Sequence, residues 1–111
     1  MKWSQSLTKK AQYASVYQQG KVWASGLVVM KALPTGLSLS RCGISVTKKV
    51  GNAVNRNRLK RLLREIIRMK SLRPGWDIVF ILRPAAADAD YHQLDKTISR
   101  LLVQAQIVEN S

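Results

Sequence analysis

Residues 51–70, GNAVNRNRLKRLLREIIRMK, predict an amphipathic helix that begins near Asn52 and ends near Lys70. Its apolar side chains recur at the i, i+3, i+4, i+7 spacing of a stripe that faces a core: Leu59, Leu62, Leu63, Ile66 and Ile67. At about 100° of rotation per residue, the basic side chains gather on the other side of the helix: Arg58, Lys60, Arg61, Arg64 and Arg68. The sequence therefore predicts a helix that packs through one face and presents positive charge to solvent from the other.

The segments on either side of this helix predict a sheet. Before it, residues 27–33 (LVVMKAL) and 40–47 (SRCGISVT) have the apolar or alternating pattern of strands, and Pro34-Thr35-Gly36 suits an antiparallel connection between them. Residues 21–25 suit a short edge strand. After the helix, residues 76–83 (WDIVFILR) are apolar almost throughout, which is typical of a strand covered on both faces.

Two further helices complete the predicted elements. Residues 9–18 carry Tyr13 and Tyr17 one helical turn apart, and Gly20 is placed to end that helix. A last helix begins near Asp88 or Asp90, either of which could cap it, and its apolar face consists of Leu94, Ile98, Leu101, Leu102 and Ala105. The expected order is αβββαβα, an α+β sandwich of helices on a sheet, in a single domain over residues 1–111.

The composition indicates a folded and strongly basic protein. Apolar residues make up 46% of the 111 residues, while 19 Lys and Arg against 6 Asp and Glu give a net charge of +13. Because this charge repels itself in a compact domain, a polyanionic partner is the simplest reason to keep it. The single cysteine, Cys42, fits a reducing compartment, and residues 1–10 lack the apolar core of a signal peptide. The apolar runs are far too short to cross a membrane, so we expect a cytoplasmic protein with no membrane partner.

The charge pattern of the basic helix favours phosphate binding over a merely solvated face. Glu65 is its only acid, and three basic residues follow one another at a spacing of four, where like charges repel: Lys60, Arg64 and Arg68. Arginine outnumbers lysine, and its planar fork binds two phosphate oxygens at once. Lys48 and Lys49 precede the helix, whose first turn offers unpaired backbone N–H groups to an anion.

The same residues carry a family resemblance. Residues 51–65 (GNAVNRNRLKRLLRE), with Arg56-Asn57-Arg58 at their centre, resemble the signature of the bacterial ribonuclease P protein subunit. Residues 43–50 (GISVTKKV) and 75–79 (GWDIV) match the flanking segments of that family, and the similarity extends over about residues 7–102. A gapless motif of this length between two strands is far more specific than a cluster of basic residues.

The resemblance implies both a fold and a function. The family has a ribosomal-protein-like fold with a mixed sheet of about four strands and a left-handed βαβ crossover, against the usual right-handed rule. Its members bind the catalytic RNA of ribonuclease P, one protein per RNA, and contact the 5′ leader that the enzyme removes from precursor tRNA. The RNA subunit performs the hydrolysis with Mg²⁺. The protein itself is therefore expected to hold no catalytic residue, no metal and no organic cofactor.

Carried over to this chain, the resemblance implies two sets of site residues. The RNA-binding set is Lys48, Lys49, Asn52, Arg56, Asn57, Arg58, Lys60, Arg61, Arg64 and Arg68. The leader-binding set is Tyr13, Tyr17, Val29 and Lys31, in a cleft between the first helix and the sheet. The tyrosines stand where the family commonly has phenylalanines. The family often has an aromatic at the position of Lys31. Because lysine has no ring to stack on a base, we expect a phosphate contact there rather than stacking. From the residues alone, two aromatics one turn apart are more typical of helix–sheet packing.

Three other function classes compete with this interpretation. A protein nuclease needs converging carboxylates or paired histidines, whereas the six acids are scattered along the chain and His92 is alone. A ribosomal or other structural RNA-binding protein has the same composition and fold type, and only the Arg56-Asn57-Arg58 signature argues against it. A helix-turn-helix DNA-binding protein needs two helices joined by a tight turn, whereas predicted strands flank the basic helix.

Overall fold

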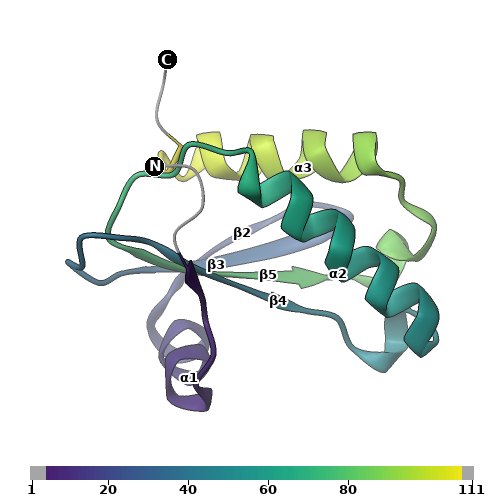
Figure 1. The fold of residues 1–111 in the computed structure, drawn as a ribbon, viewed down its shortest axis with the longest axis horizontal. Coiled ribbons are helices and arrows are strands. Elements are labelled where there is room, and N and C mark those ends of the chain that lie inside the picture. The colour runs from purple at the N-terminus through teal and green to yellow at the C-terminus, as the bar shows by residue number, and fades with distance from the viewer. Residues whose placement is uncertain (1–4, 109–111) are drawn as a thin grey trace.

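The computed structural model describes residues 5–108, whose strands form one mixed sheet in the middle of the molecule (Figure 1). The order of the strands across the sheet is β1-β4-β5-β3-β2. Their bounds are Gln5–Ser6 for β1, Lys21–Ala24 for β2, Val28–Pro34 for β3, Arg41–Ser45 for β4 and Trp76–Leu82 for β5. β4 runs parallel to both β1 and β5, while β3 is antiparallel to both β5 and β2.

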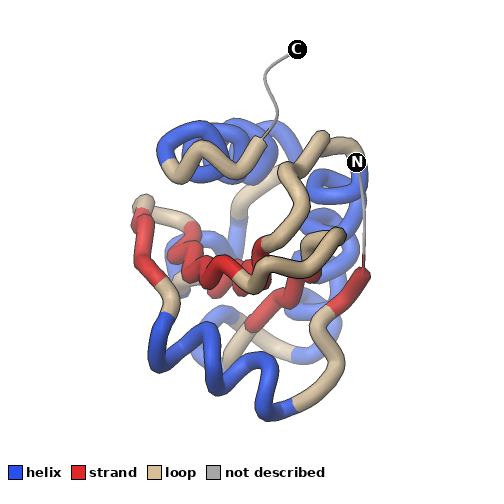
Figure 2. The backbone as a smooth tube through the Cα atoms, turned by 90° about the vertical axis from the view of Figure 1, so that its left-hand side faces the viewer, coloured by secondary structure: helices blue, strands red, loops and turns tan. Residues whose placement is uncertain are grey.

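Helices cover both faces of this sheet. α1 (Lys10–Gln19) lies on one face, and α2 (Ala53–Arg68) and α3 (Tyr91–Gln104) lie on the other, so Figure 2 shows three layers. Short 3₁₀ turns lead into the two longer helices: η1 (Lys48–Val50) precedes α2, and η2 (Pro84–Asp88) precedes α3. Among the described residues, no helix combines the length and the apolar composition needed to cross a membrane.

β5 is the central strand of the sheet and is covered on both sides. It pairs with β3 on one edge and with β4 on the other. Val79 belongs to a small core under α1, whereas Ile78, Phe80 and Leu82 belong to a larger core under α2 and α3. Burial on both faces therefore explains the almost unbroken apolar run of this strand, as predicted.

The connection from β4 to β5 passes through α2 and is left-handed. In Figure 1 the chain leaves β4 at the front, rises into α2 above the sheet and returns to β5 behind β4. This confirms the hand that the family resemblance implied, although parallel strands are nearly always joined by a right-handed crossover. A right-handed connection would have put α2 on the face that α1 occupies. The hand of this crossover therefore decides which face of the sheet carries the basic helix.

The larger core fills the space between the sheet and the helices α2 and α3. Val28, Met30 and Ala32 of β3 point into it, together with the predicted apolar stripe of α2. The intervening residues of β3 point to the face that carries α1, because side chains alternate along a strand. On that face Leu7, Val16 and Val79 form the smaller core.

Side-chain caps fix where the two longer helices begin. The Oδ1 atom of Asn52 accepts a hydrogen bond from the backbone N–H of Asn55 at 2.9 Å, so α2 starts where the sequence predicts. At the start of α3, the Gln93 N–H donates to Asp90 Oδ1 at 2.9 Å and the Asp90 N–H donates to Gln93 Oε1 at 3.1 Å. Asp90 rather than Asp88 is therefore the cap, since Asp88 ends the preceding η2 turn.

Two features of the sheet differ from the prediction, although the order αβββαβα of the longer elements is confirmed. The first is β1, which pairs with β4 and which is too short to leave a pattern in the sequence. The second is the position of β5, which lies between β3 and β4. Pro34-Thr35-Gly36 reverses the chain without forming a hairpin, because the strand that is apolar on both faces takes the central place.

Leu63→Ala should destabilise the protein more than Leu62→Ala, although the two residues are neighbours in the sequence. Leu63 is fully buried in the larger core, whereas Leu62 is half-buried at its margin. A buried Leu→Ala truncation costs about 2–5 kcal/mol of unfolding free energy, so we expect Leu63→Ala within this range and Leu62→Ala below it. Urea unfolding followed by circular dichroism measures both losses. Equal losses would contradict the packing of α2 described above.

Candidate nucleic-acid interface

The solvent-facing side of α2 is strongly basic. Its exposed polar and charged side chains are Asn57, Arg61, Arg64, Glu65 and Arg68. Lys48 and Lys49 are also exposed in the η1 turn, directly before the first turn of α2. Because the apolar stripe lies on the opposite side, these side chains are held toward solvent by the packing of the helix itself. The face therefore offers several arginines, with a single acid among them, to a polyanion.

Arg58 was predicted to face solvent with the other basic residues, and this prediction was wrong. Its guanidinium points toward the connection between β5 and α3, where Nη1 donates to the Ala89 carbonyl oxygen at 3.3 Å and Nη2 donates to the Ala87 carbonyl oxygen at 3.2 Å. Nε donates to Oδ1 of Asn55 at 3.0 Å. The wheel places Arg58 at the margin of the basic arc, and η2 with the start of α3 covers that margin.

Three further members of the predicted RNA-binding set are partly engaged by the protein. Arg56 lies on the wheel within the arc of the apolar stripe and is half-buried, and its enclosed Nε atom has no hydrogen-bond partner within residues 5–108. Lys60 is half-buried on the side of α2 that faces β4. Asn52 uses its Oδ1 atom as the helix cap. The exposed part of the predicted set is therefore smaller than the sequence suggests.

Two tyrosines of α1 and a lysine of β3 form a cluster on the other face of the sheet. The ring centroids of Tyr13 and Tyr17 are 6.5 Å apart. The Nζ atom of Lys31 lies 5.3 Å from the centroid of the Tyr17 ring, within reach of a cation–π interaction. Tyr17 is 40% exposed, so ring surface remains open, whereas Tyr13 is half-buried. Val29, which is half-buried, points to the same face of the sheet as Lys31.

Tyr13 is anchored against the backbone of β4. Its hydroxyl donates to the Leu7 carbonyl oxygen at 3.3 Å. A Cβ atom added at Gly43 would lie 2.6 Å from the Tyr13 hydroxyl oxygen and 2.7 Å from carbons of its ring. Burial raises the pKa of the Tyr13 hydroxyl, and the nearby Tyr17 adds to this increase. Only a residue without a side chain lets the ring approach the strand so closely, so Gly43 sets the position of Tyr13.

A cavity of about 250 Å³ joins the two surfaces across the edge of β4. Its lining combines both predicted sets, with Tyr13 from α1, Gly43 and Ile44 from β4, and Lys60 and Arg64 from α2. β1 pairs with β4 only as far as Cys42, so the strand edge beyond that point borders the cavity. A second, apolar hollow of about 500 Å³ lies along α1 and is lined by Tyr17 and again by Tyr13. The basic helix and the aromatic cluster are therefore parts of one connected surface.

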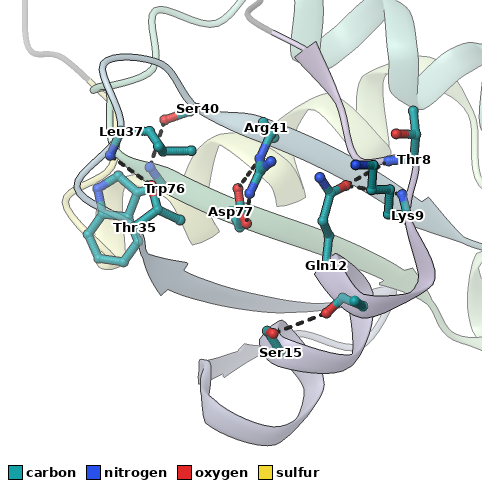
Figure 3. A network of polar contacts seen from close by, with 11 residues as sticks. Thr8, Lys9, Gln12, Ser15, Thr35, Leu37, Ser40, Arg41, Trp76 and Asp77 are labelled. Carbon is teal, nitrogen blue, oxygen red and sulfur yellow. Dashed lines mark hydrogen bonds and ion pairs between the residues drawn. The ribbon is translucent and has the colours of Figure 1, made fainter.

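A partly buried ion pair neutralises the acid of β5 on the face that carries α1. Arg41 of β4 donates from Nε to Asp77 Oδ1 at 2.8 Å and from Nη2 to Asp77 Oδ2 at 2.6 Å (Figure 3). Asp77 is buried, and its hydrogen bond to Arg41 raises the pKa of that guanidinium. Figure 3 shows the pair beside the first turn of α1, which Gln12 caps. The Asp77 carboxylate therefore adds no unpaired negative charge to the α1 side of the sheet, where Lys31 also lies.

The acidic and thiol groups give no support to the nuclease alternative. Within residues 5–108, no three His, Cys, Asp or Glu side chains gather in a group that could hold a metal ion. Cys42 is buried in the larger core, and desolvation raises the pKa of its thiol to about 12. A thiol of this kind stays protonated near neutral pH and is not a nucleophile.

Comparisons with known proteins agree with this geometry. A family model described as Ribonuclease P matches residues 1–106. The ribonuclease P protein component of Dehalococcoides mccartyi is 46% identical over 111 residues, which cover 100% of this chain and 92% of the relative. The structure of the Staphylococcus aureus RNase P protein matches with 30% identity and a TM-score of 0.83, over 93% of this chain and 96% of that one. The Thermotoga maritima RNase P protein matches with 30% identity and a TM-score of 0.82, over 89% and 96%.

The chain belongs to the ribonuclease P protein family. It is accordingly the protein component of the ribonucleoprotein that processes tRNA, and the RNA subunit of that enzyme is its partner. The resemblance of residues 51–65 to this family is thereby confirmed, as is the fold that it implied. Membership in the ribonuclease P family also sets aside the ribosomal and helix-turn-helix alternatives. The strands β4 and β5 do flank α2 in the chain, as expected.

Some contacts of this ribonuclease P protein were missed because the sequence carries little signal for them. The cation–π contact of Lys31 with Tyr17 depends on how α1 lies across β3, which the pattern of neither segment reveals. The Asn55–Arg58 pair has a spacing of three on a helix, which is suggestive, but its carbonyl partners come from a distant segment. The close approach at Gly43 had a signal, since a glycine inside a strand often marks a nearby backbone or ring.

Gly43→Ala should destabilise the protein, whereas Gly26→Ala should not. The added methyl group at Gly43 would overlap the ring of Tyr13, so the ring would have to leave its place against β4 and its hydrogen bond to Leu7. Forced overpacking typically costs about 1–3 kcal/mol. At Gly26 an added Cβ atom meets nothing within 4 Å, which makes it the matched control. Urea unfolding of both variants tests this, and an unchanged midpoint for Gly43→Ala would mean that Tyr13 is not held against β4.

Proposed function

We propose that the exposed face of α2 binds the catalytic RNA of ribonuclease P, and that the surface between α1 and the sheet holds the 5′ leader of precursor tRNA. The cavity at the edge of β4 carries this proposal, because Tyr13 from the aromatic cluster and Arg64 from the basic helix both line it. A continuous surface of this kind can bind a folded RNA on one side and a single strand on the other.

The catalytic RNA would be bound chiefly through phosphate contacts from α2. Arg61, Arg64 and Arg68 are exposed on one side of the helix, and the amide of Asn57 adds a donor and an acceptor. Each guanidinium fork suits two phosphate oxygens. Lys48 and Lys49 lie beside the positive end of the helix dipole, which also favours an anion. Binding a polyanion would relieve the repulsion between arginines spaced by four residues.

The leader would run past the aromatic cluster. Tyr17 offers open ring surface for stacking on a base, while Tyr13 is held in place by β4 and Leu7. Lys31 keeps a positive charge beside the Tyr17 ring, and Val29 contributes apolar surface of the same face of β3. Because Lys60 and Arg64 share a cavity with Tyr13, we assign these two residues to the meeting point of the leader and the catalytic RNA.

We assign the hydrolysis itself to the RNA subunit with Mg²⁺, and propose one protein per RNA. The described carboxylates do not converge and so do not fit a protein-held Mg²⁺ site. What this chain supplies is positive charge that lowers the cation requirement of the RNA, and surface that extends the contact with the substrate. We propose that this work takes place in the cytoplasm, a reducing compartment that suits the free thiol of Cys42.

Reconstitution with a bacterial ribonuclease P RNA tests the assignment of catalysis. At low Mg²⁺, RNA plus protein should remove the leader of precursor tRNA far faster than RNA alone, because the protein neutralises phosphates that Mg²⁺ would otherwise have to screen. Purified protein without RNA should not cleave. Gel analysis of the 5′ cleavage product measures all three reactions, and cleavage by protein freed of RNA would restore the nuclease alternative.

Tyr17→Ala should weaken the binding of precursor tRNA to the holoenzyme and leave the binding of mature tRNA nearly unchanged. Stacking of a base on an aromatic ring is worth about 1–3 kcal/mol, so we expect a loss of that order with a long leader. The loss should vanish when the leader is trimmed to one or two nucleotides.

Tyr91→Ala provides the matched control for this experiment. Tyr91 is 41% exposed, close to the 40% of Tyr17, but it begins α3 on the opposite face of the sheet. The control variant should bind both forms of tRNA as the wild type does. If Tyr17→Ala instead lost the same affinity with and without a leader, and also melted at a lower temperature, Tyr17 would be a core residue rather than a leader contact.

A further inference from the structure

The second arginine of the Arg56-Asn57-Arg58 signature is used inside the protein. The Nε, Nη1 and Nη2 atoms of Arg58 all donate to protein oxygens: Asn55 Oδ1 at 3.0 Å, Ala89 O at 3.3 and 3.4 Å, and Ala87 O at 3.2 Å. A guanidinium has five N–H groups in a fixed plane, and these bonds use every one of its nitrogens. The fork that would clasp a phosphate is therefore directed at backbone carbonyls.

Asn55 completes this network and fixes its geometry. Its Nδ2 atom donates to the Ala87 carbonyl oxygen at 3.0 Å, while its Oδ1 atom accepts from Nε of Arg58. Only one orientation of the amide satisfies both bonds, because the nitrogen donates and the oxygen accepts. The Ala87 carbonyl thus receives two donors from successive turns of α2. We call this group of Asn55, Arg58 and the two carbonyls the carbonyl clamp.

The carbonyl clamp joins α2 to a segment far along the chain. Ala87 lies in η2, and Ala89 lies between η2 and the Asp90 cap of α3. Ala86 and Ala89 are buried in the larger core, so this segment is itself fixed to the body of the protein. Near the other end of α2, Nζ of Lys70 bonds Asp95 and also Ser99 of α3, the latter at 2.8 Å. α2 is therefore tied to the layer of α3 by polar contacts near both of its ends.

We infer that Arg58 is a positioning residue: it does not bind an RNA phosphate but locks the first turns of α2 onto η2 and so orients the exposed residues Asn57 and Arg61. This inference rests on the proposed RNA-binding role of α2. Within the Arg56-Asn57-Arg58 signature, it replaces a phosphate contact by Arg58 with a positioning role. A lysine would keep the charge of Arg58, but a single ammonium group cannot reproduce the planar arrangement that reaches Asn55, Ala87 and Ala89 together. Geometry rather than charge is therefore the requirement at this position.

Conservative and non-conservative variants separate these two requirements in the free protein. Arg58→Lys and Arg58→Ala should both lower the urea midpoint, since both remove the fork. Arg61→Lys and Arg61→Ala are the matched controls, because Arg61 is exposed on the same helix; both should unfold at the wild-type midpoint. Asn55→Ala should lower the midpoint as well, and adding it to Arg58→Ala should cost less than the sum of the two, since both act on Ala87.

Binding to ribonuclease P RNA, measured over a range of KCl concentrations where circular dichroism shows each variant folded, gives the decisive readout. Arg58→Ala and Arg58→Lys should bind on the order of two- to thirtyfold more weakly, the range for residues that act on a site from outside it. The slope of log affinity against log salt should stay at the wild-type value for both. Arg61→Ala should instead lower the magnitude of that slope by about one unit.

Three results would overturn the inference. One is a lower salt slope for Arg58→Ala, which would mean a phosphate contact. Another is wild-type stability and affinity for Arg58→Lys, which would mean that charge suffices. The third is a lower midpoint with wild-type affinity in the folded variants, which would make the clamp a stabilising contact that does not orient α2. If wild-type protein failed to bind the RNA, the proposed function would fail instead, while the unfolding comparison would still test the clamp.

Discussion

Burial of β5 on both faces is the constraint from which the positions of the functional surfaces follow. A strand covered on both sides needs a layer above and a layer below, and α1 supplies one while α2 and α3 supply the other. The aromatic cluster and the basic helix consequently lie on opposite faces of one sheet. They meet only where the sheet ends, at the edge of β4, where β1 covers the strand for two residue pairs and then stops. A ligand that touches both surfaces has to cross this edge.

Packing energy explains how α2 can hold so much unbalanced charge. Burying a Leu or Ile side chain fully is worth about 1.5–3 kcal/mol, and four such residues of α2 are completely buried: Leu59, Leu63, Ile66 and Ile67. Repulsion between like charges at a spacing of four costs only about 0.2–0.5 kcal/mol per pair. The apolar stripe therefore outweighs the repulsion several times over. The exposed face can be shaped for a polyanion because the packing of the buried face outweighs the repulsion that this charge causes.

The parts of the structure that local pattern determines were predictable from the sequence, and the parts that depend on distant partners were not. The spacing of the apolar residues predicted α2, and the nearly unbroken apolar run of residues 76–83 predicted a strand buried on both faces. The signature at residues 51–65 gave the family. By contrast, the place of β5 between β3 and β4 depends on pairing across the whole chain. The inward orientation of Arg58 also depends on a distant partner, because its carbonyl acceptors lie about thirty residues away in the sequence. No sequence pattern within α2 predicts this contact.

The strand order also has a kinetic consequence. In this sheet, a short turn connects only one pair of neighbouring strands, β2 and β3. At least one other element separates the two strands in each of the remaining pairs, which are β1 with β4, β4 with β5, and β3 with β5. Most of the sheet must therefore form by closing long loops. The chain loses conformational entropy in closing them before strand pairing contributes favourable free energy. Chains with such non-local pairing fold slowly for their size. The β2–β3 hairpin and α2 are the local units that can form early. The central strand β5 comes late in the chain, and the cores on its two faces cannot form until it has paired with β3 and β4.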